Sequence, residues 1–172
     1  IATQNHYGAV GTQALPESQL DRFMVRLSIG YPGRDSQVKI LKNRRGTGDM
    51  DLVNPRMNAD DIKSIQGYLY SIKIVDEILY YITDLCEATR NHSMVELGVS
   101  PRGVNALAQF ARARAVLKER DYVIPEDVQA VFLDVCAHRL VMKPQAKIEG
   151  ITATDVLQSV LQQIKAPALG RK

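Results

Sequence analysis

The amino-acid sequence predicts a mainly α-helical protein, in which a helical bundle follows a short segment of mixed α/β character. From about residue 36 onward, apolar side chains recur at spacings of three and four, the period of a helix with one buried face. Before that point Gly8 and Gly11 interrupt the chain, and residues 24–29 follow the alternation of a strand. Because Tyr31-Pro32-Gly33 separates the two patterns, we expect one unit at residues 1–32 and a helical unit at residues 33–172.

The first unit is expected to contain two strands and a short helix. Residues 1–3 form an apolar run, residues 16–23 have the composition of one or two helical turns, and residues 24–29 form the second strand. Two strands without further partners do not make a stable sheet. We therefore expect this unit to be the end of a larger domain.

The helical unit begins with three predicted helices. The first spans residues 36–43 and ends in a basic, glycine-containing loop. The second starts after Asn58, a good N-cap residue, and is expected to bury Ile62, Ile65 and Leu69. The third spans residues 75–89, where the apolar spacing is that of a core helix.

Three more helices are predicted from their N-terminal signals. Ser100 is placed to cap a helix with Pro101 at its first position, and Pro125 starts the next helix by the same device. Thr152 and Asp155 have the spacing of a capping box before the last helix, at residues 156–164. The second unit is thus expected to be a bundle of about six helices.

Composition restricts the function classes. The net charge of +3 comes from 22 basic and 19 acidic residues that are interspersed along the chain, which disfavours nucleic acid as a partner. Arg112, Arg114, Lys118 and Arg120 form a basic cluster, which we interpret as a solvated helix face.

The cysteines and histidines give no metal-site pattern. Cys86 and Cys136 lie in apolar helical stretches and lack zinc-site spacing, so buried free thiols in a reducing compartment are expected. The histidines are widely separated, and His138-Arg139 is interpreted as an ordinary helix end.

No apolar run approaches the roughly 18 residues that span a bilayer, and no leader pattern is present, so a cytoplasmic location is expected.

Three separated motifs carry a family resemblance. They are Ala2-Thr3-Gln4-Asn5, Leu20-Asp21-Arg22-Phe23 and Gly98-Val99-Ser100-Pro101-Arg102. In this order and spacing the chain resembles the MoxR family of AAA+ ATPases. The resemblance implies that residues 1–32 are the C-terminal end of an AAA+ core and that residues 33–172 are the helical AAA+ lid.

Asn5 follows the first apolar run, where α/β sheets place ligand contacts. Its amide can donate and accept hydrogen bonds, so it could orient a water molecule against a γ-phosphate. The resemblance implies that Asn5 is the residue called sensor 1. The alternative is an asparagine that caps the turn after the strand.

Arg22 lies in a turn whose apolar neighbours are expected to anchor it, which leaves Asp21 and Arg22 pointing outward. A planar guanidinium with a fixed charge can stabilise a transferring phosphoryl group. The resemblance implies that Arg22 is the arginine finger that reaches the ATP of the adjacent subunit. From the residues alone, a surface ion pair with Asp21 or Glu17 is favoured. Arg26 competes for the role of the finger but is expected to be structural.

Arg102 lies in the first turn of the predicted helix after Ser100, where a cation opposes the helix dipole. Its position therefore calls for an anionic partner. The resemblance implies a sensor 2 arginine that couples the lid to bound nucleotide. Simple solvent exposure is the alternative.

The functional expectation follows from these motifs and from one missing pattern. The sequence contains no Gly-x-x-x-x-Gly-Lys-Ser/Thr loop to cradle phosphates, so the chain alone is expected to be inactive. The resemblance implies a full-length ATPase that uses ATP and Mg²⁺ in a homo-oligomeric ring, a hexamer, to remodel, mature or activate client proteins. A von Willebrand type A domain protein is the partner that the family suggests. The alternative function is a non-enzymatic helical interaction module.

Overall fold

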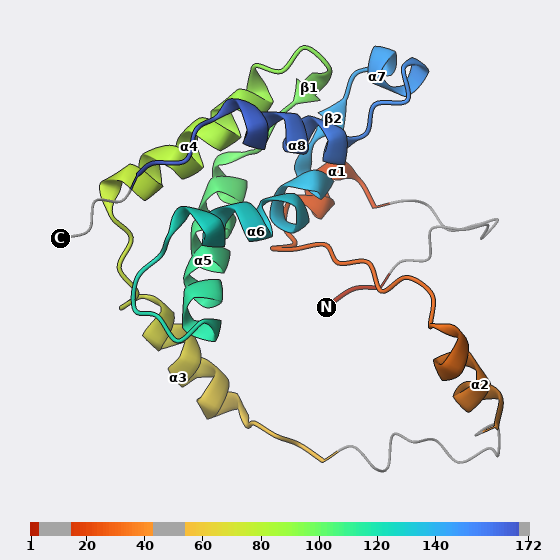
Figure 1. The fold of residues 1–172 in the computed structure, drawn as a ribbon, viewed down its shortest axis with the longest axis vertical. Helices are drawn as coiled ribbons and strands as arrows, with labels where there is room; N and C mark the ends of the chain where they lie inside the picture. Colours follow the sequence, from red (N-terminus) through yellow and green to blue (C-terminus); the bar gives the residue numbers. More distant parts are fainter. Residues whose placement is uncertain (4–14, 43–53, 169–172) are drawn as a thin grey trace.

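The computed structural model describes residues 1–3, 15–42 and 54–168 of the chain. These residues are predominantly helical, which confirms the predicted fold class (Figure 1). The elements are α1 (Glu17–Leu20), α2 (Arg34–Lys42), α3 (Ala59–Leu69), α4 (Asp76–Arg90), β1 (Val95–Leu97), α5 (Pro101–Leu117), α6 (Pro125–Cys136), the 3₁₀ turn η2 (Ala137–Arg139), β2 (Val141–Met142), α7 (Pro144–Ile148) and α8 (Ala153–Gln163).

The core of the bundle lies between α4, α5, α6 and α8, which pack against one another (Figure 1). The most extensive helix contact joins α5 to α6. It is close because α5 buries the small side chains of Ala106, Ala111 and Ala115. Phe132 of α6 is the largest fully buried side chain in the described residues, so it fills much of the space between the helices.

The predicted capping residues are confirmed, although α8 begins at Ala153, directly after Thr152, and not at residue 156. The Asn58 side chain accepts hydrogen bonds from the amides of Asp60 and Asp61 at 2.8 and 2.9 Å. The Ser100 hydroxyl accepts from the amide of Gly103 at 3.2 Å, and that of Thr152 accepts from Asp155 at 3.2 Å. Local capping chemistry therefore sets where α3, α5 and α8 begin.

The cysteines are buried and unpaired, as expected. A hydrogen bond with Cys86, together with burial, raises the pKa of the Cys136 thiol well above its ordinary value. The thiol is therefore neutral near pH 7 and acts as a small apolar group in the core.

The predicted strands are wrong for the described residues. Residues 1–3 and 24–29 lie outside helices and strands. Among the described residues they have no neighbouring strand to pair with, and the alternation alone does not satisfy backbone groups. The strands that do form are β1 and β2, a short antiparallel pair that the sequence pattern did not reveal, as it did not reveal α7.

Helices α2 and α3 bury none of their residues. Ile62 and Ile65, which were expected to be buried, are 50% and 46% exposed, so that expectation was wrong. An apolar stripe indicates which face would be buried, but burial also requires a packing partner. The division of the chain at residues 32–33 stays a prediction.

The basic residues in α5 and in the turn that follows it are less solvated than expected. Arg120 forms a two-pronged ion pair with Asp127 at 2.6 and 2.8 Å, and Arg114 lies 3.7 Å from the same carboxylate. Arg112 donates to the carbonyl of Ile72 at 3.3 Å. The prediction of a solvated face was therefore wrong for Arg120 and Arg112, which are partly buried and bind acceptors of the fold, whereas the Arg114 side chain remains 39% exposed.

Asp127 is the buried anion at the start of α6, with an exposed fraction of 1%. Besides the arginines, its carboxylate accepts a hydrogen bond from the amide of Ile124 at 3.0 Å.

None of the helices in the described ranges is long and apolar enough to cross a membrane.

We expect Asp127→Asn to lower the free energy of unfolding by about 3 kcal/mol, since it leaves the Arg120 guanidinium without its counter-charge in a mostly buried site. Chemical denaturation of the two proteins measures this difference. Lys63→Ala, which removes an exposed ion pair with Asp60, is the control and should leave stability unchanged. Equal stability of Asp127→Asn and the original protein would contradict the assigned role.

Candidate functional site

The loop before α5 is fixed by the end of α4. Buried Thr89 accepts a hydrogen bond from the amide of Val99 at 3.0 Å, and Arg90 donates to the carbonyl of Val99 at 2.8 Å. Gly98 is required because a Cβ there would lie 2.6 Å from the backbone of Arg90. These contacts set the position of Ser100 and the first turn of α5.

A second glycine opens space beside that turn. A Cβ on Gly103 would lie 2.5 Å from Cγ1 of Val99 and 2.9 Å from Cδ of Arg139. The absence of a side chain at Gly103 therefore lets the stem of Arg139 cross the start of α5. This brings the guanidinium group from η2 to the loop that follows α1.

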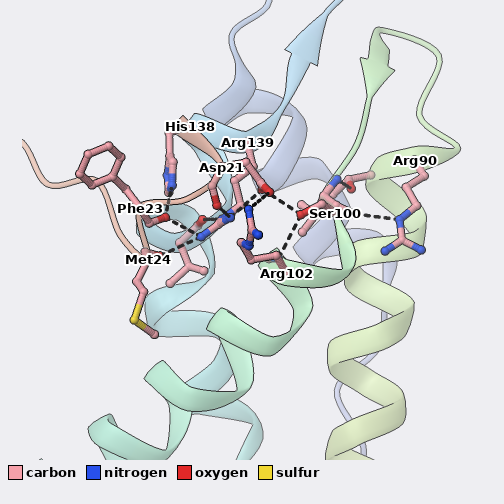
Figure 2. Close-up of polar contacts among 12 residues, drawn as sticks. Asp21, Phe23, Met24, Arg90, Ser100, Arg102, His138 and Arg139 are labelled. Carbon is pink, nitrogen blue, oxygen red and sulfur yellow. Dashed lines mark hydrogen bonds and ion pairs between the residues drawn. The ribbon is translucent and has the colours of Figure 1, made fainter. Parts of the chain in front are cut away.

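Asp21, at the end of α1, joins the two segments (Figure 2). Its Oδ1 accepts from the Ser100 hydroxyl at 2.8 Å and from Nη1 of Arg139 at 2.7 Å. Its Oδ2 lies 3.6 Å from Nη1 of Arg102. One carboxylate thus contacts the cap of α5, the first turn of α5 and η2, so the expectation that Asp21 points outward was wrong.

The balance of these contacts lowers the pKa of Asp21. Burial alone would raise it, but the hydrogen bonds from Ser100 and Arg139 and the charges of Arg139 and Arg102 outweigh burial. Asp21 is therefore ionised at neutral pH and acts as an anion that holds these groups together.

His138 supports the same loop from η2. Its Nε2 lies 3.0 Å from the carbonyl oxygen of Phe23, which can only accept, so Nε2 carries the proton. Burial lowers the pKa of His138, against the opposing effect of that hydrogen bond. The ring is neutral near pH 7 and donates to the backbone directly after Arg22.

Two of the three predicted site residues come together. Arg22 and Arg102 line one surface pocket of about 170 Å³, which is completed by Met24, Asn105, Ala106, Gln109 and Arg139. Arg22 is exposed, and within the described residues no ion pair of Arg22 with Asp21 or Glu17 is found. Asn5 lies outside the described residues.

Arg102 has the anionic partner that its position called for, namely Asp21. The ion pair is loose, and the Arg102 side chain remains 61% exposed. It can therefore exchange this partner for another anion that enters the pocket. Arg26, the competitor for the role of the finger, is exposed and contributes a backbone hydrogen bond to Asp134 at 3.0 Å.

Sequence reasoning missed Asp21 and Arg139 as members of the site. Arg139 was interpreted as part of an ordinary helix end, but its side chain is 1% exposed. The available signal was the pair of glycines around Ser100, because glycines at such positions indicate a close approach by another group. The identity of that group was not available from local sequence. No group of three or more metal-ligating side chains occurs within the described ranges.

Residues 87–160 match the family model described as AAA lid domain. Over 97% of its length, the chain is 40% identical to protein MoxR of Methylorubrum extorquens, of which it covers 54%, and 31% identical to chaperone MoxR1 of Mycobacterium tuberculosis, of which it covers 46%. The chain belongs to the MoxR family of AAA+ ATPases. It is also 37% identical to the uncharacterized protein YeaC of Bacillus subtilis over 97% of the chain and 52% of that relative.

The fold is also similar to that of a solved structure. A crystal structure described as that of a "putative ATPase" from Cytophaga hutchinsonii superposes with a TM-score of 0.84 at 28% identity, covering 96% of this MoxR-family chain and 53% of that one. The chain spans about half the length of the relatives it matches. The residues that match the AAA lid model, 87–160, run from the last turn of α4 into α8.

We expect Gly103→Ala to destabilise this MoxR-family chain by about 1–2 kcal/mol, because the added methyl group would overlap buried Val99 and the stem of Arg139. The same change in an open helix usually stabilises by up to about 1 kcal/mol. Gly67→Ala in α3 is the matched control, since nothing lies within 4 Å of its added Cβ. Thermal and chemical unfolding compare the variants, and a Gly103→Ala protein as stable as Gly67→Ala would contradict the close approach.

We expect the stabilising effect of Asp21 to depend on pH. A carboxylate whose folded pKa is lowered stabilises the fold above its ordinary pKa of 3.8, and that contribution is lost as the pH falls through the folded value. The original chain should thus be more stable than Asp21→Asn at pH 6, and the difference should shrink as the pH falls below about 4. Denaturation curves of both proteins across this range test the expectation. A difference in stability that does not change with pH would contradict it.

Proposed function

We propose that the protein containing this chain hydrolyses ATP in the cytoplasm as a ring-shaped homo-oligomer, a hexamer, and uses the energy to remodel, mature or activate other proteins. The observation that carries the proposal is the placement of Arg22 and Arg102, distant in sequence, on one pocket. A relative named as a chaperone supports the assignment of protein clients. A protein with a von Willebrand type A domain is the proposed partner.

The pocket suits a polyphosphate by its charge. Arg22 contributes an exposed guanidinium, and Arg102 is held only by a contact of 3.6 Å to Asp21. Two cations at an open pocket provide donors for phosphate oxygens, and guanidinium groups bind such oxygens in a planar, two-pronged manner. The residues present therefore fit the phosphate end of a nucleotide.

Each arginine has a separate proposed role. Arg22 stabilises the charge that develops on the phosphoryl group of a neighbouring subunit's nucleotide, and Arg102 reports the presence of nucleotide to the lid. Asn5 orients the attacking water. ATP with Mg²⁺, when bound, supplies the transferable phosphoryl group with its charge partly neutralised. Since the sequence lacks a glycine phosphate loop, we expect the isolated chain not to hydrolyse ATP.

The test joins this chain to an AAA+ core that carries a glycine phosphate loop, taken from a MoxR relative. In that assembly Arg22→Ala should reduce the rate of ATP hydrolysis by about 10³-fold or more, because an arginine finger acts mainly on the transition state. The affinity for ATP should stay within about threefold. Steady-state phosphate release and fluorescent-nucleotide titration measure the two quantities.

Arg26→Ala is the matched control, since Arg26 is an exposed arginine on the same segment and its fold contact is made by the backbone. It should hydrolyse ATP at nearly the original rate. Full hydrolysis by the Arg22→Ala assembly would overturn the proposal and favour a helical interaction module without enzymatic activity.

A further inference from the structure

We infer that Arg139 is a positioning residue for ATP hydrolysis, which holds the loop bearing Arg22 in place for the neighbouring active site. This inference rests on the proposed role of Arg22. It assigns a function to a buried side chain of η2 that the motifs do not include.

Arg139 binds the backbone on both sides of Arg22 (Figure 2). Its Nη1 donates to the carbonyl of Asp21 at 2.5 Å, and its Nη2 donates to the carbonyls of Phe23 and Met24 at 2.6 and 3.3 Å. The loop gains anchors immediately before and after Arg22. The backbone at Arg22 is thus held on both sides, while the Arg22 side chain itself stays exposed.

Arg139 is in turn fixed by the bundle. Its Nε donates to the carbonyl of Val135 in α6 at 2.8 Å, and its stem passes Gly103 at the start of α5. With an exposed fraction of 1%, the side chain has no room for another rotamer. The position of Arg22 is thereby set by α5 and α6 of the lid.

The guanidinium of Arg139 has no donor left for a phosphate. It carries five N–H groups, and they meet Val135, both the carbonyl and the carboxylate of Asp21, Phe23 and Met24. Although Arg139 lines the pocket, it is therefore not a ligand for nucleotide. Any effect on hydrolysis has to act through the loop that carries Arg22.

Asp21 extends this unit to Arg102. Its Oδ1 binds Arg139 and its Oδ2 faces Arg102. An anion that draws Arg102 away changes the charge around Asp21 and so the contact that holds the loop. The geometry connects the residue that we propose senses nucleotide with the residue that we propose acts on the next subunit.

The experiment uses the same assembly of this chain with an AAA+ core. Arg139→Lys keeps the charge but offers a single ammonium group, which cannot reach all three loop carbonyls. We expect kcat to fall at least tenfold while KM for ATP stays within about threefold, since ATP contacts are untouched. We expect Arg22→Ala combined with Arg139→Lys to be no slower than Arg22→Ala alone, as measured by single-turnover hydrolysis of labelled ATP.

Two controls separate positioning from loss of fold. Asp127→Asn weakens the opposite end of α6 and should leave kcat of the folded assembly nearly unchanged. Asp21→Asn retains a carbonyl oxygen for Arg139 and serves if Arg139→Lys does not fold. Asp21→Asn should lower kcat at least threefold. When it is combined with Arg22→Ala, it should cause no further loss of kcat.

Three results would overturn the inference. The first is an unchanged kcat in folded Arg139→Lys or Asp21→Asn, and the second is a loss of kcat in either variant that multiplies with the loss caused by Arg22→Ala. The third is a loss of kcat in Asp127→Asn as large as that in Arg139→Lys. Full activity of Arg22→Ala would instead overturn the proposed function. The two failures are therefore distinguishable.

Discussion

The buried ion pair between Arg139 and Asp21 is the interaction on which the site depends. A guanidinium that is 1% exposed is costly to bury unless its charge and every donor are matched. The carboxylate of Asp21 supplies the charge, and backbone carbonyls from two segments supply the remaining acceptors. All five N–H groups of Arg139 have acceptors, so a shift of the loop after α1 or of the end of α6 would leave buried donors unpaired.

This requirement explains why the loop after α1 is attached to η2, which lies far from it in sequence. Arg139 and Asp21 lie 118 positions apart. Their contact, together with the hydrogen bonds from Ser100 to Asp21 and from His138 to Phe23, attaches the loop after α1 to the bundle. The apolar core of the bundle fixes α5 and α6, which carry these polar groups or lie next to them. Core packing therefore makes the bundle rigid, and the polar contacts determine which loop is attached to it.

The parts of the structure that could be predicted from sequence are those governed by local chemistry. Asn58, Ser100 and Thr152 act on amides two or three residues away, so their helices were predicted with nearly correct starts. The family motifs singled out Arg22 and Arg102 one by one, and only the structure shows that both line one pocket. By contrast, the role of Arg139 depends on a partner that no local pattern specifies, and the apolar stripe of α3 did not show that Ile62 and Ile65 would remain exposed.

Gly103 has a consequence for how this protein can change over evolutionary time. Its hydrogen occupies space that a methyl group would have to share with Val99 and with the stem of Arg139. A larger residue at position 103 therefore requires smaller side chains at both position 99 and position 139, and a shorter side chain at position 139 would release Asp21 from its counter-charge. The glycine, the arginine and the aspartate consequently form an evolutionary unit, in which single replacements are disfavoured and compensated sets of replacements are the open route.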